Sequence, residues 1–228
     1  MPPGGAPGGR ARPLLLVGAG GLARETLAAV RSYDRPPWAP LGFLDDNPER
    51  HGQTLDGLPV LGPVEAVHEH PDVAVVLCTA SAKDQASRQR IQDRLGLPAE
   101  RYATVLHVGA SLARGTEVGP GSIMLAGVVV TAPQRIGAHV VAMPHVVLTH
   151  DDEVGDYVTL AGRVSLSGGV RVGDGAYLGT GALVRESLRV GAWSLVGMGA
   201  VVLSDVPPFE VWVGNPARRL RRVEVRLA

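Results

Sequence analysis

The sequence has one cysteine, no excess of charge and no long apolar run. Its 228 residues include 22 Lys+Arg and 22 Asp+Glu. Because no net charge creates a field that would attract nucleic acid or an anionic membrane, we expect neither as a partner. A single cysteine excludes a disulfide within the chain. Cys78 directly follows the apolar run 73–77, which predicts a buried, unreactive thiol in a reducing compartment.

The apolar runs are too short to span a bilayer. Residues 1–13 are rich in Pro and Gly, contain two arginines and lack the apolar segment of a signal peptide. This composition predicts a disordered lead-in. We therefore expect a soluble, cytoplasmic protein, and the length of the remaining chain favours two domains over one.

A six-residue repeat runs through the second half of the sequence. Every sixth residue from Leu112 to Val202 is apolar. An ordinary β-sandwich with alternating strands would not keep one register over so long a stretch, whereas a fixed short period is the signature of a β-solenoid. A second inward column, four residues after the first, is mostly small or β-branched and comprises Ser122, Val128, Val140, Val146, Val158, Val164, Val170, Ala176, Ala182, Ser194 and Ala200.

A second period of 18 residues is superimposed on the first. The residue after the repeat aliphatic is glycine at five positions that are 18 residues apart. Three hexapeptides therefore make one coil, and the coil is a triangular prism with the aliphatic side chains stacked inside. We expect the recurring glycines to supply the positive φ that a corner requires. They are Gly119, Gly137, Gly155, Gly173 and Gly191.

The first half of the sequence has the pattern of a small α/β domain. We expect strands at 14–17, 41–44 and 73–77 and helices at 24–30 and 84–95. The Gly-rich segment 18–23 connects the first strand to the first helix. This order directs backbone N–H groups at a phosphate, although the same segment also suits a tight turn without a ligand.

The length of this first half limits what it can bind. In a dinucleotide site Asp45 would hold a ribose hydroxyl. The chain before the coil is too short for both halves of a classical NAD fold, so a single mononucleotide half fits better. In that case Asp45 and Asp46, which follow the second strand, would face a base or sugar.

One hexapeptide of the coil is strongly polar. His150 lies two residues after the inward Leu148, so its side chain should point outward. Asp151 and Asp152 beside it could orient the ring and increase its basicity, as expected of a general base near pH 7. Charged runs are often solvated corners. The repeat favours a site, because Gly168 lies one coil after His150 and leaves room and a backbone N–H for a ligand.

The other histidines of the coil and the C-terminal arginines have alternative interpretations. The spacing of His145 and His150 resembles that of the zinc histidines of gamma-class carbonic anhydrases, but no third histidine lies in register, so we expect no metal. His107, His139 and His145 are expected to be corner or interface residues. The arginines at 218, 219, 221 and 222 form a cluster that is either solvated or holds cofactor phosphates.

Three motifs together resemble the sugar acyltransferases of the NeuD/PglD type. They are Gly18-Ala19-Gly20-Gly21, Phe43-Leu44-Asp45-Asp46 and Gly214-Asn215-Pro216-Ala217, with the hexapeptide coil between the last two. The resemblance covers residues 14–222. It implies an α/β N-terminal Rossmann-like half domain followed by an all-β left-handed parallel β-helix. The expected boundaries are a lead-in 1–13, a nucleotide- or sugar-binding domain 14–105, the β-helix acyltransferase domain 106–213 and a basic tail 214–228.

The resemblance also implies an activity and a set of site residues. Enzymes of this type transfer an acetyl group from acetyl-CoA to an amine or hydroxyl of a sugar, often a nucleotide-linked amino sugar, and form homotrimers with ligand sites between adjacent prisms. The catalytic histidine and its acidic neighbour fall on His150 and Asp151, and the glycine near the thioester falls on Gly168. Further cofactor contacts are expected at Gly197, Met198, Gly199 and Arg218, and acceptor contacts at Gly18, Gly20, Gly21, Phe43, Asp45, Asp46 and Thr159.

Two positions depart from the pattern of this type. Leu22 stands where some members have a histidine, and Thr159 replaces a second active-site histidine. Rival hypotheses are a non-catalytic trimeric scaffold that binds sugar nucleotides, a carbonic-anhydrase-like metal hydratase and a nicotinamide oxidoreductase. The sequence leaves open the identity of the acceptor, the choice between amide and ester, and donors other than acetyl-CoA.

Overall fold

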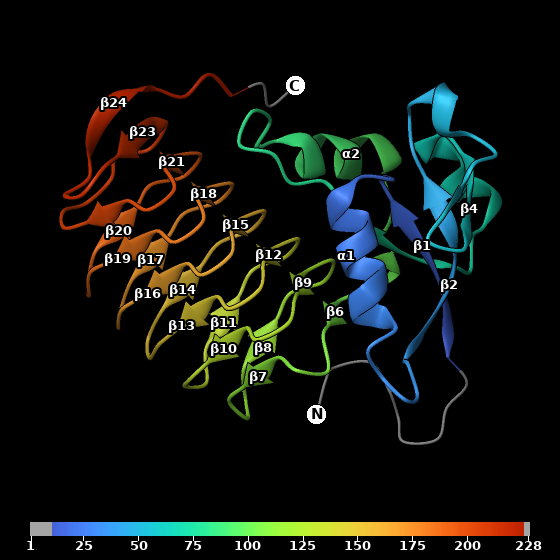
Figure 1. The fold of residues 1–228 in the computed structure, drawn as a ribbon, viewed down its shortest axis with the longest axis horizontal. Coiled ribbons are helices and arrows are strands. Elements are labelled where there is room, and N and C mark those ends of the chain that lie inside the picture. Colours follow the sequence, from blue (N-terminus) through green and yellow to red (C-terminus); the bar gives the residue numbers. More distant parts are fainter. Residues whose placement is uncertain (1–10, 226–228) are drawn as a thin grey trace.

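The computed structural model describes residues 11–225. The first part is a five-stranded sheet in the order β3-β4-β2-β1-β5, flanked by the helices α1 and α2 (Figure 1). All neighbouring strands are parallel except β3 and β4. The bounds are β1 (Arg12–Val17), α1 (Gly21–Val30), β2 (Trp38–Leu44), η1 (Pro48–Arg50), β3 (Thr54–Leu55), β4 (Leu58–Gly62), η2 (Val64–Glu69), β5 (Ala74–Leu77), α2 (Ser87–Leu95) and η3 (Ala99–Arg101).

Several element boundaries differ from those expected. β1 begins at Arg12, so the strand includes two residues that were assigned to the lead-in; residues 1–10 lie outside the described part. α1 begins at Gly21, inside the Gly-rich segment. α2 begins only at Ser87, because Ser81 and Asp84 form a bridge and the Ser81 hydroxyl accepts a hydrogen bond from the Lys83 N–H. Side-chain hydrogen bonds of this kind favour turns over helix.

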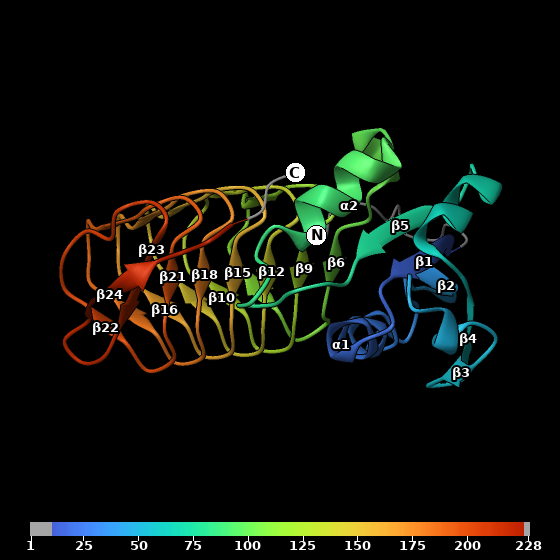
Figure 2. The same ribbon diagram turned by 90° about the horizontal axis from the view of Figure 1, so that it is seen from above.

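The second part is a parallel β-helix whose short strands form three flat faces (Figure 2). The β6 face contains β6 (Val105–Leu106), β9 (Ile123–Met124), β12 (Val141–Ala142), β15 (Thr159–Leu160), β18 (Tyr177–Leu178) and β21 (Leu195–Val196). The β7 face contains β7 (Ser111–Leu112), β10 (Val129–Val130), β13 (Val147–Leu148), β16 (Ser165–Leu166), β19 (Leu183–Val184) and β22 (Val201–Val202). The β8 face contains β8 (Glu117–Val118), β11 (Arg135–Ile136), β14 (Glu153–Val154), β17 (Arg171–Val172) and β20 (Arg189–Val190).

The 18-residue coil is confirmed by the strand register. Val147 pairs with Ser165 and Leu148 with Leu166, so equivalent residues of adjacent coils lie side by side. The repeat aliphatics and the predicted second column are packed into one buried cluster inside the prism. The expected fold class, an α/β half domain followed by a left-handed parallel β-helix, is confirmed.

The predicted role of the recurring glycines is wrong. None of them has a positive φ; they are needed because the next coil comes too close for a side chain. A Cβ on Gly119 would lie 2.6 Å from the carbonyl carbon of Gly137. The positive φ values occur elsewhere in the corners, at six-residue steps or multiples of them: Gly115, Gly121, Gly127, His139, His145, Asp151, Tyr157, Arg163, Gly169, Gly175, Gly181, Ser187, Trp193 and Gly199.

The outer surfaces of the three faces differ in chemistry. The outward residues of the β8 face are charged and form ion pairs between Arg135 and Glu117 at 3.0 Å and between Arg171 and Glu153 at 3.3 Å. The β6 face is covered by the α/β part, which buries outward residues such as Val141. No element of residues 11–225 covers the β7 face, and its outward residues are uncharged: Ser111, Val129, Val147, Ser165, Leu183 and Val201.

A buried arginine connects the α/β part to the coil. Arg88 of α2 is 1 % exposed, and its guanidinium donates to the carbonyl oxygens of His139 at 3.0 Å and Thr79 at 2.6 Å. It also donates to the Thr159 hydroxyl at 2.8 Å and to the Tyr157 carbonyl. Burial lowers the pKa of Arg88 to about 10, so the side chain remains charged at neutral pH.

The C-terminal segment is more ordered than a basic tail. β23 (Glu210–Val213) extends the β6 face, and β24 (Arg218–Arg222) pairs with it in antiparallel orientation. Arg219 is bound to Glu210 at 2.8 Å, which fixes one arginine of the cluster.

Across residues 11–225 no helix has the length and apolar character needed to cross a bilayer.

Candidate active site

His150 lies at the corner between β13 and β14. The chain turns there because Asp151 adopts a positive φ of 62°. The side chain of His150 points outward as predicted and is 69 % exposed, and its Nδ1 lies 2.8 Å from Oδ2 of Asp151. A carboxylate beside Nδ1 stabilises the tautomer that carries its proton there. The lone pair of Nε2 is then available to accept a proton from a ligand.

Gly168 lies directly against the His150 ring. A Cβ on Gly168 would be 2.5 Å from Nε2 of His150, so only glycine fits beside the ring in this position. The Gly169 N–H donates to the His150 carbonyl oxygen at 2.9 Å and holds the two corners together. Within residues 11–225 the Gly168 N–H has no hydrogen-bond partner. It can therefore donate to an oxygen that develops negative charge near Nε2.

Asp152 interacts electrostatically with His150, but it is not exposed beside the imidazole as the sequence suggested. Its side chain points into the prism and is 2 % exposed. Burial raises the pKa of Asp152, while hydrogen bonds from the backbone N–H groups of Val170 and Thr149 oppose the rise. The Asp152 N–H donates to Oε1 of Gln134 at 3.0 Å. We missed Gln134, although 134 and 152 are polar positions of the inward column exactly one coil apart.

Thr159 is not available to a substrate, which corrects its expected role. It lies on β15 of the β6 face, opposite the corner that carries His150. The residue is 4 % exposed, and its hydroxyl accepts a hydrogen bond from Arg88. Thr159 therefore belongs to the contact between the α/β part and the coil. The sequence repeat could not reveal this, because it does not indicate which face of the prism is covered.

The expected cofactor residues lie at another corner. The segment Gly197–Gly199 follows β21 and precedes β22, so it joins the β6 face to the β7 face. Met198 is 80 % exposed there. Arg218 lies near this corner. It pairs with Val213 across the strands β23 and β24, and the Val213 side chain packs against Gly197. This corner and the His150 corner flank opposite edges of the β7 face, so one chain does not bring them together.

The Gly-rich turn forms one wall of a cavity of about 320 Å³ at the carboxyl ends of β1, β2 and β5. Oδ2 of Asp45 accepts a hydrogen bond from the Ala19 N–H at 2.7 Å, and Oδ1 accepts one from the Asn47 N–H at 2.9 Å. Asp45 thereby shapes the turn. The first N–H groups of α1 point out of a helix N-terminus, which favours an anion. The lining includes Gly18, Gly20, Gly21, Leu22, Arg50 and Thr79.

Phe43 is a second correction among the expected substrate contacts. It is 0 % exposed and packs in the core of the α/β part. Its side chain has no surface to offer to a ligand.

Cys78 is buried as predicted, and burial raises the pKa of its thiol to about 12. At neutral pH the sulfur is therefore protonated and unreactive.

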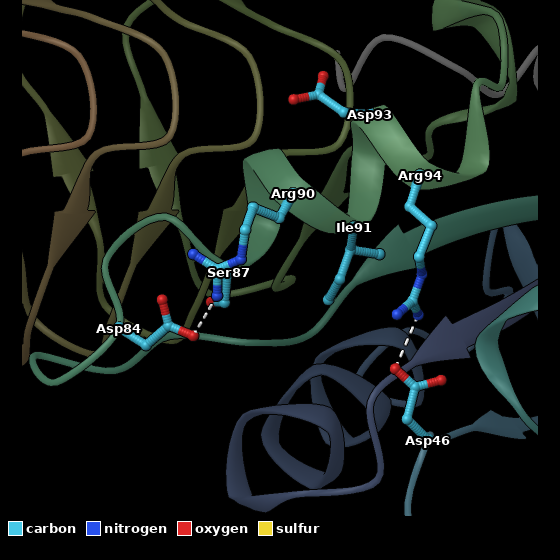
Figure 3. A pocket seen from close by; sticks show the side chains of 7 residues that line it. All are labelled: Asp46, Asp84, Ser87, Arg90, Ile91, Asp93 and Arg94. Carbon is cyan, nitrogen blue, oxygen red and sulfur yellow. Dashed lines mark hydrogen bonds and ion pairs between the residues drawn. The ribbon is translucent and has the colours of Figure 1, made fainter. Parts of the chain in front are cut away.

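A second hollow of about 630 Å³ lies beside α2 (Figure 3). Arg94 reaches across it to Asp46 at 2.7 Å and also binds Glu65 at 2.9 Å. At the other end Arg90 and Asp84 lie 2.5 Å apart. Asp46 therefore borders this hollow and is already held by Arg94. Its other oxygen accepts a hydrogen bond from the Val64 N–H at 3.2 Å.

The other coil histidines lie at corners, as expected. His139 is 1 % exposed and is stacked on Tyr157, with ring centroids 5.3 Å apart. Burial lowers the pKa of His139 to about 4. His145 lies at a corner between the β6 and β7 faces. Among residues 11–225 no three side chains of metal-ligand type converge.

The same architecture is found in sugar acetyltransferases of known structure. The acetyltransferase domain of PglB from Neisseria gonorrhoeae FA1090 is 27 % identical, with 92 % of this chain and 100 % of that chain covered and a TM-score of 0.80. A perosamine N-acetyltransferase from Caulobacter crescentus is 25 % identical, with 91 % and 96 % covered and a TM-score of 0.80. WeeI from Acinetobacter baumannii AYE is 27 % identical, with 92 % and 100 % covered and a TM-score of 0.76.

The chain is an acyltransferase, and its structure is similar to sugar acetyltransferases of the NeuD/PglD type. No sequence-family profile and no curated protein sequence matches the chain, so the assignment comes from similarity across nearly the whole structure. The neighbours cover both the α/β part and the coil. In this acyltransferase the exposed pair of His150 and Asp151 beside Gly168 is therefore the candidate catalytic group.

Proposed function

We propose that this acyltransferase transfers the acetyl group of acetyl-CoA to an amino group of a nucleotide-linked sugar. The single observation that carries the proposal is the contact of His150 with Asp151 on one side and Gly168 on the other. Similar proteins support the choice of ligands. The PglB domain is known in complex with acetyl coenzyme A, and the perosamine N-acetyltransferase in complex with CoA and GDP-perosamine.

In the proposed reaction Nε2 of His150 is the general base. The acceptor nitrogen attacks the thioester carbonyl carbon, and Nε2 accepts the proton that this nitrogen loses. The Gly168 N–H donates a hydrogen bond to the carbonyl oxygen as it becomes negative. The C–S bond then breaks, and the CoA sulfur leaves with the electron pair and takes the proton from Nε2 of His150 to form the thiol. Asp151 stabilises the imidazolium during this step through Nδ1.

The proposed acceptor site is the Gly-rich cavity of the α/β part. The diphosphate of a nucleotide sugar would meet the N–H groups of Gly20 and Gly21 at the start of α1. Arg50, 41 % exposed at its side chain, lies close enough to contribute positive charge. Gly18 and Asp45 shape the turn, whereas Asp46 borders the separate hollow beside α2.

We further propose that the active enzyme is a homotrimer with its sites between subunits. The β7 face supports this, because it is uncharged and uncovered, and Leu183 on it is 46 % exposed. The proposed cofactor residues Gly197–Gly199 and Arg218 lie at one edge of this face and His150 at the other. A second copy against the β7 face could bring its cofactor corner to the first copy's His150.

We place the reaction in the cytoplasm, where a reduced Cys78 is stable.

The role of His150 can be tested with two matched variants. We expect His150→Ala to reduce kcat about 10²–10⁴-fold, the usual contribution of a general base. His68→Ala, an exposed histidine on η2 of the α/β part, should retain wild-type kcat. The measurement is mass spectrometry of products formed from acetyl-CoA and a panel of nucleotide-linked amino sugars. Full activity of His150→Ala would exclude the proposed mechanism.

A binding measurement separates the enzyme from the scaffold hypothesis. A ligand that binds only the folded state raises Tm. We expect millimolar CoA to raise the Tm of the wild-type protein. Absence of a shift with CoA, together with a shift caused by a nucleotide sugar, would favour a scaffold that binds sugar nucleotides without catalysis.

A further inference from the structure

Asp152 is an ionisable side chain inside the prism. It occupies the inward column in which Val146, Val158 and Val170 stand at other corners, and it is only 2 % exposed. A carboxylate in an apolar column is unfavourable unless its oxygens are hydrogen-bonded. Burial raises the pKa of Asp152 despite the bonds that it accepts. The residue is therefore a poor choice for stability alone.

The two oxygens of Asp152 bind two different corners. Oδ2 accepts a hydrogen bond from the Thr149 N–H at 2.9 Å. Oδ1 accepts one from the Val170 N–H in the next coil, also at 2.9 Å. Thr149 directly precedes His150, and Val170 follows Gly168 by two residues. The carboxylate therefore ties the corner that carries the base to the corner that carries Gly168.

Another corner of the coil shows what a simpler side chain does at this kind of position. Ser122 also lies in the inward column, and its hydroxyl accepts a hydrogen bond from the Val140 N–H one coil later at 3.0 Å. A single hydroxyl oxygen is thus sufficient to join two coils. Oδ2 of Asp152 is therefore not needed to join the coils. It instead holds the backbone at Thr149, next to His150.

We propose that Asp152 is a positioning residue that keeps Nε2 of His150 in place over Gly168. The inference rests on the proposed role of His150 as base. Its physical basis is that a reacting group must be held within a fraction of an ångström, and that loss of such support lowers the rate of the chemical step. Gln134 supports the arrangement from the preceding coil, because its Oε1 accepts the Asp152 N–H.

The test is the variant Asp152→Ser, which retains one acceptor oxygen and removes the buried charge. We expect the hydroxyl to bond Val170 as Ser122 bonds Val140, so that Tm is unchanged or raised. The bond to Thr149 is lost. We expect kcat to fall at least about tenfold while KM for acetyl-CoA and for the acceptor stays within about twofold, because neither ligand touches Asp152. Asp152→Asn, which cannot accept both N–H groups, should reduce kcat similarly.

Ser122→Ala is the matched control. It removes a bond between coils at a corner without candidate site residues, and it should lower Tm while kcat stays unchanged. Wild-type kcat in Asp152→Ser would overturn the proposal. An equal loss of kcat in Ser122→Ala would also overturn it, because the effect would then be merely structural.

A second readout does not depend on turnover. We expect the imidazole NMR signals of His150, assigned with the His150→Ala variant, to change in Asp152→Ser and to stay unchanged in Ser122→Ala. Unchanged signals in Asp152→Ser would contradict the positioning role. An inactive wild-type protein would instead contradict the proposed acetyl transfer, so the two failures are distinguishable.

Discussion

Gly168 is important because it has no side chain and so leaves space for the His150 ring. The His150 ring occupies the space where a Cβ would stand, so an added methyl group has to displace the imidazole. The displaced atoms belong to the end of an exposed side chain, which can move without disturbing the coil. The effect should therefore appear in catalysis and hardly in stability.

We expect Gly168→Ala to reduce kcat about 10- to 100-fold, as misplacement of a catalytic group by about 1 Å does. Steady-state kinetics and a thermal melt measure the two effects. The matched control is Gly162→Ala, the equivalent corner position one hexapeptide earlier, where a Cβ would meet only the Pro144 carbonyl oxygen at 3.5 Å. Wild-type kcat in Gly168→Ala would show that the ring does not need its observed position.

Residues within the coil were predictable because parallel pairing fixes their neighbours. The 18-residue period alone placed Gly168 beside His150, and the register of Val147 with Ser165 confirms it. The repeat could not predict the burial of residues that contact the α/β part or lie within it. Thr159 and Phe43 looked accessible in sequence but are buried by packing of the α/β part, and this packing has no periodic signal.

At the level of elements, α2 connects the Gly-rich cavity, the proposed acceptor site, to the coil. Arg88 donates to the Thr79 carbonyl oxygen, and Thr79 lines the cavity. The Thr79 side chain in turn lies close to the Gly-rich turn, since a Cβ on Gly18 would be 3.4 Å from its Cγ2. The guanidinium therefore fixes a cavity wall relative to the prism.

We expect Arg88→Met to raise KM for the nucleotide sugar about tenfold and to lower Tm, because several buried carbonyl groups lose their donor. KM for acetyl-CoA should stay within about twofold. Gln85→Ala is the matched control, since Gln85 Nε2 donates to Gly175 and Ser194 of the coil but not to the cavity wall. It should lower Tm and leave both KM values unchanged. Equal KM effects in the two variants would contradict a specific role of Arg88.

The start of α2 could not be read correctly from composition. Asp84 and Gln85 suit a helix, yet residues 81–86 form a turn that carries Gln85 onto the coil. The same limitation applies to the C-terminal arginines, whose strand β24 exists because β23 offers an edge to pair with. In both places a tertiary contact decided the local structure.

At the level of the whole molecule, we propose that the β7 face is the interface between the subunits of the homotrimer. Its outward side chains are apolar or small, in contrast to the charged rows of the β8 face. A row of apolar and small, partly exposed side chains is consistent with the proposed interface. The proposed cofactor corner at one edge and His150 at the other give a reason for a second copy to bind there.

We expect Leu183→Asp to dissociate the trimer and to abolish acetyl transfer, because a buried, unpaired carboxylate in an interface is strongly unfavourable. Analytical ultracentrifugation measures the mass, and product formation measures the activity. Arg135→Ser on the β8 face removes an exposed ion pair, which contributes little to stability, and should leave a fully active trimer. A wild-type sedimentation coefficient for Leu183→Asp would exclude the β7 face as the interface.

The stacked coils also fix distances along the prism axis. Neighbouring strands lie about 4.8 Å apart, so each 18-residue coil adds one fixed increment along the prism axis. The number of coils between the His150 corner and the Gly197–Gly199 corner thus sets the axial distance between them. Removing or duplicating one coil in this interval would change that distance by one increment while leaving both corners intact. In the proposed trimer, the number of repeats would therefore set the length of a ligand that contacts both corners.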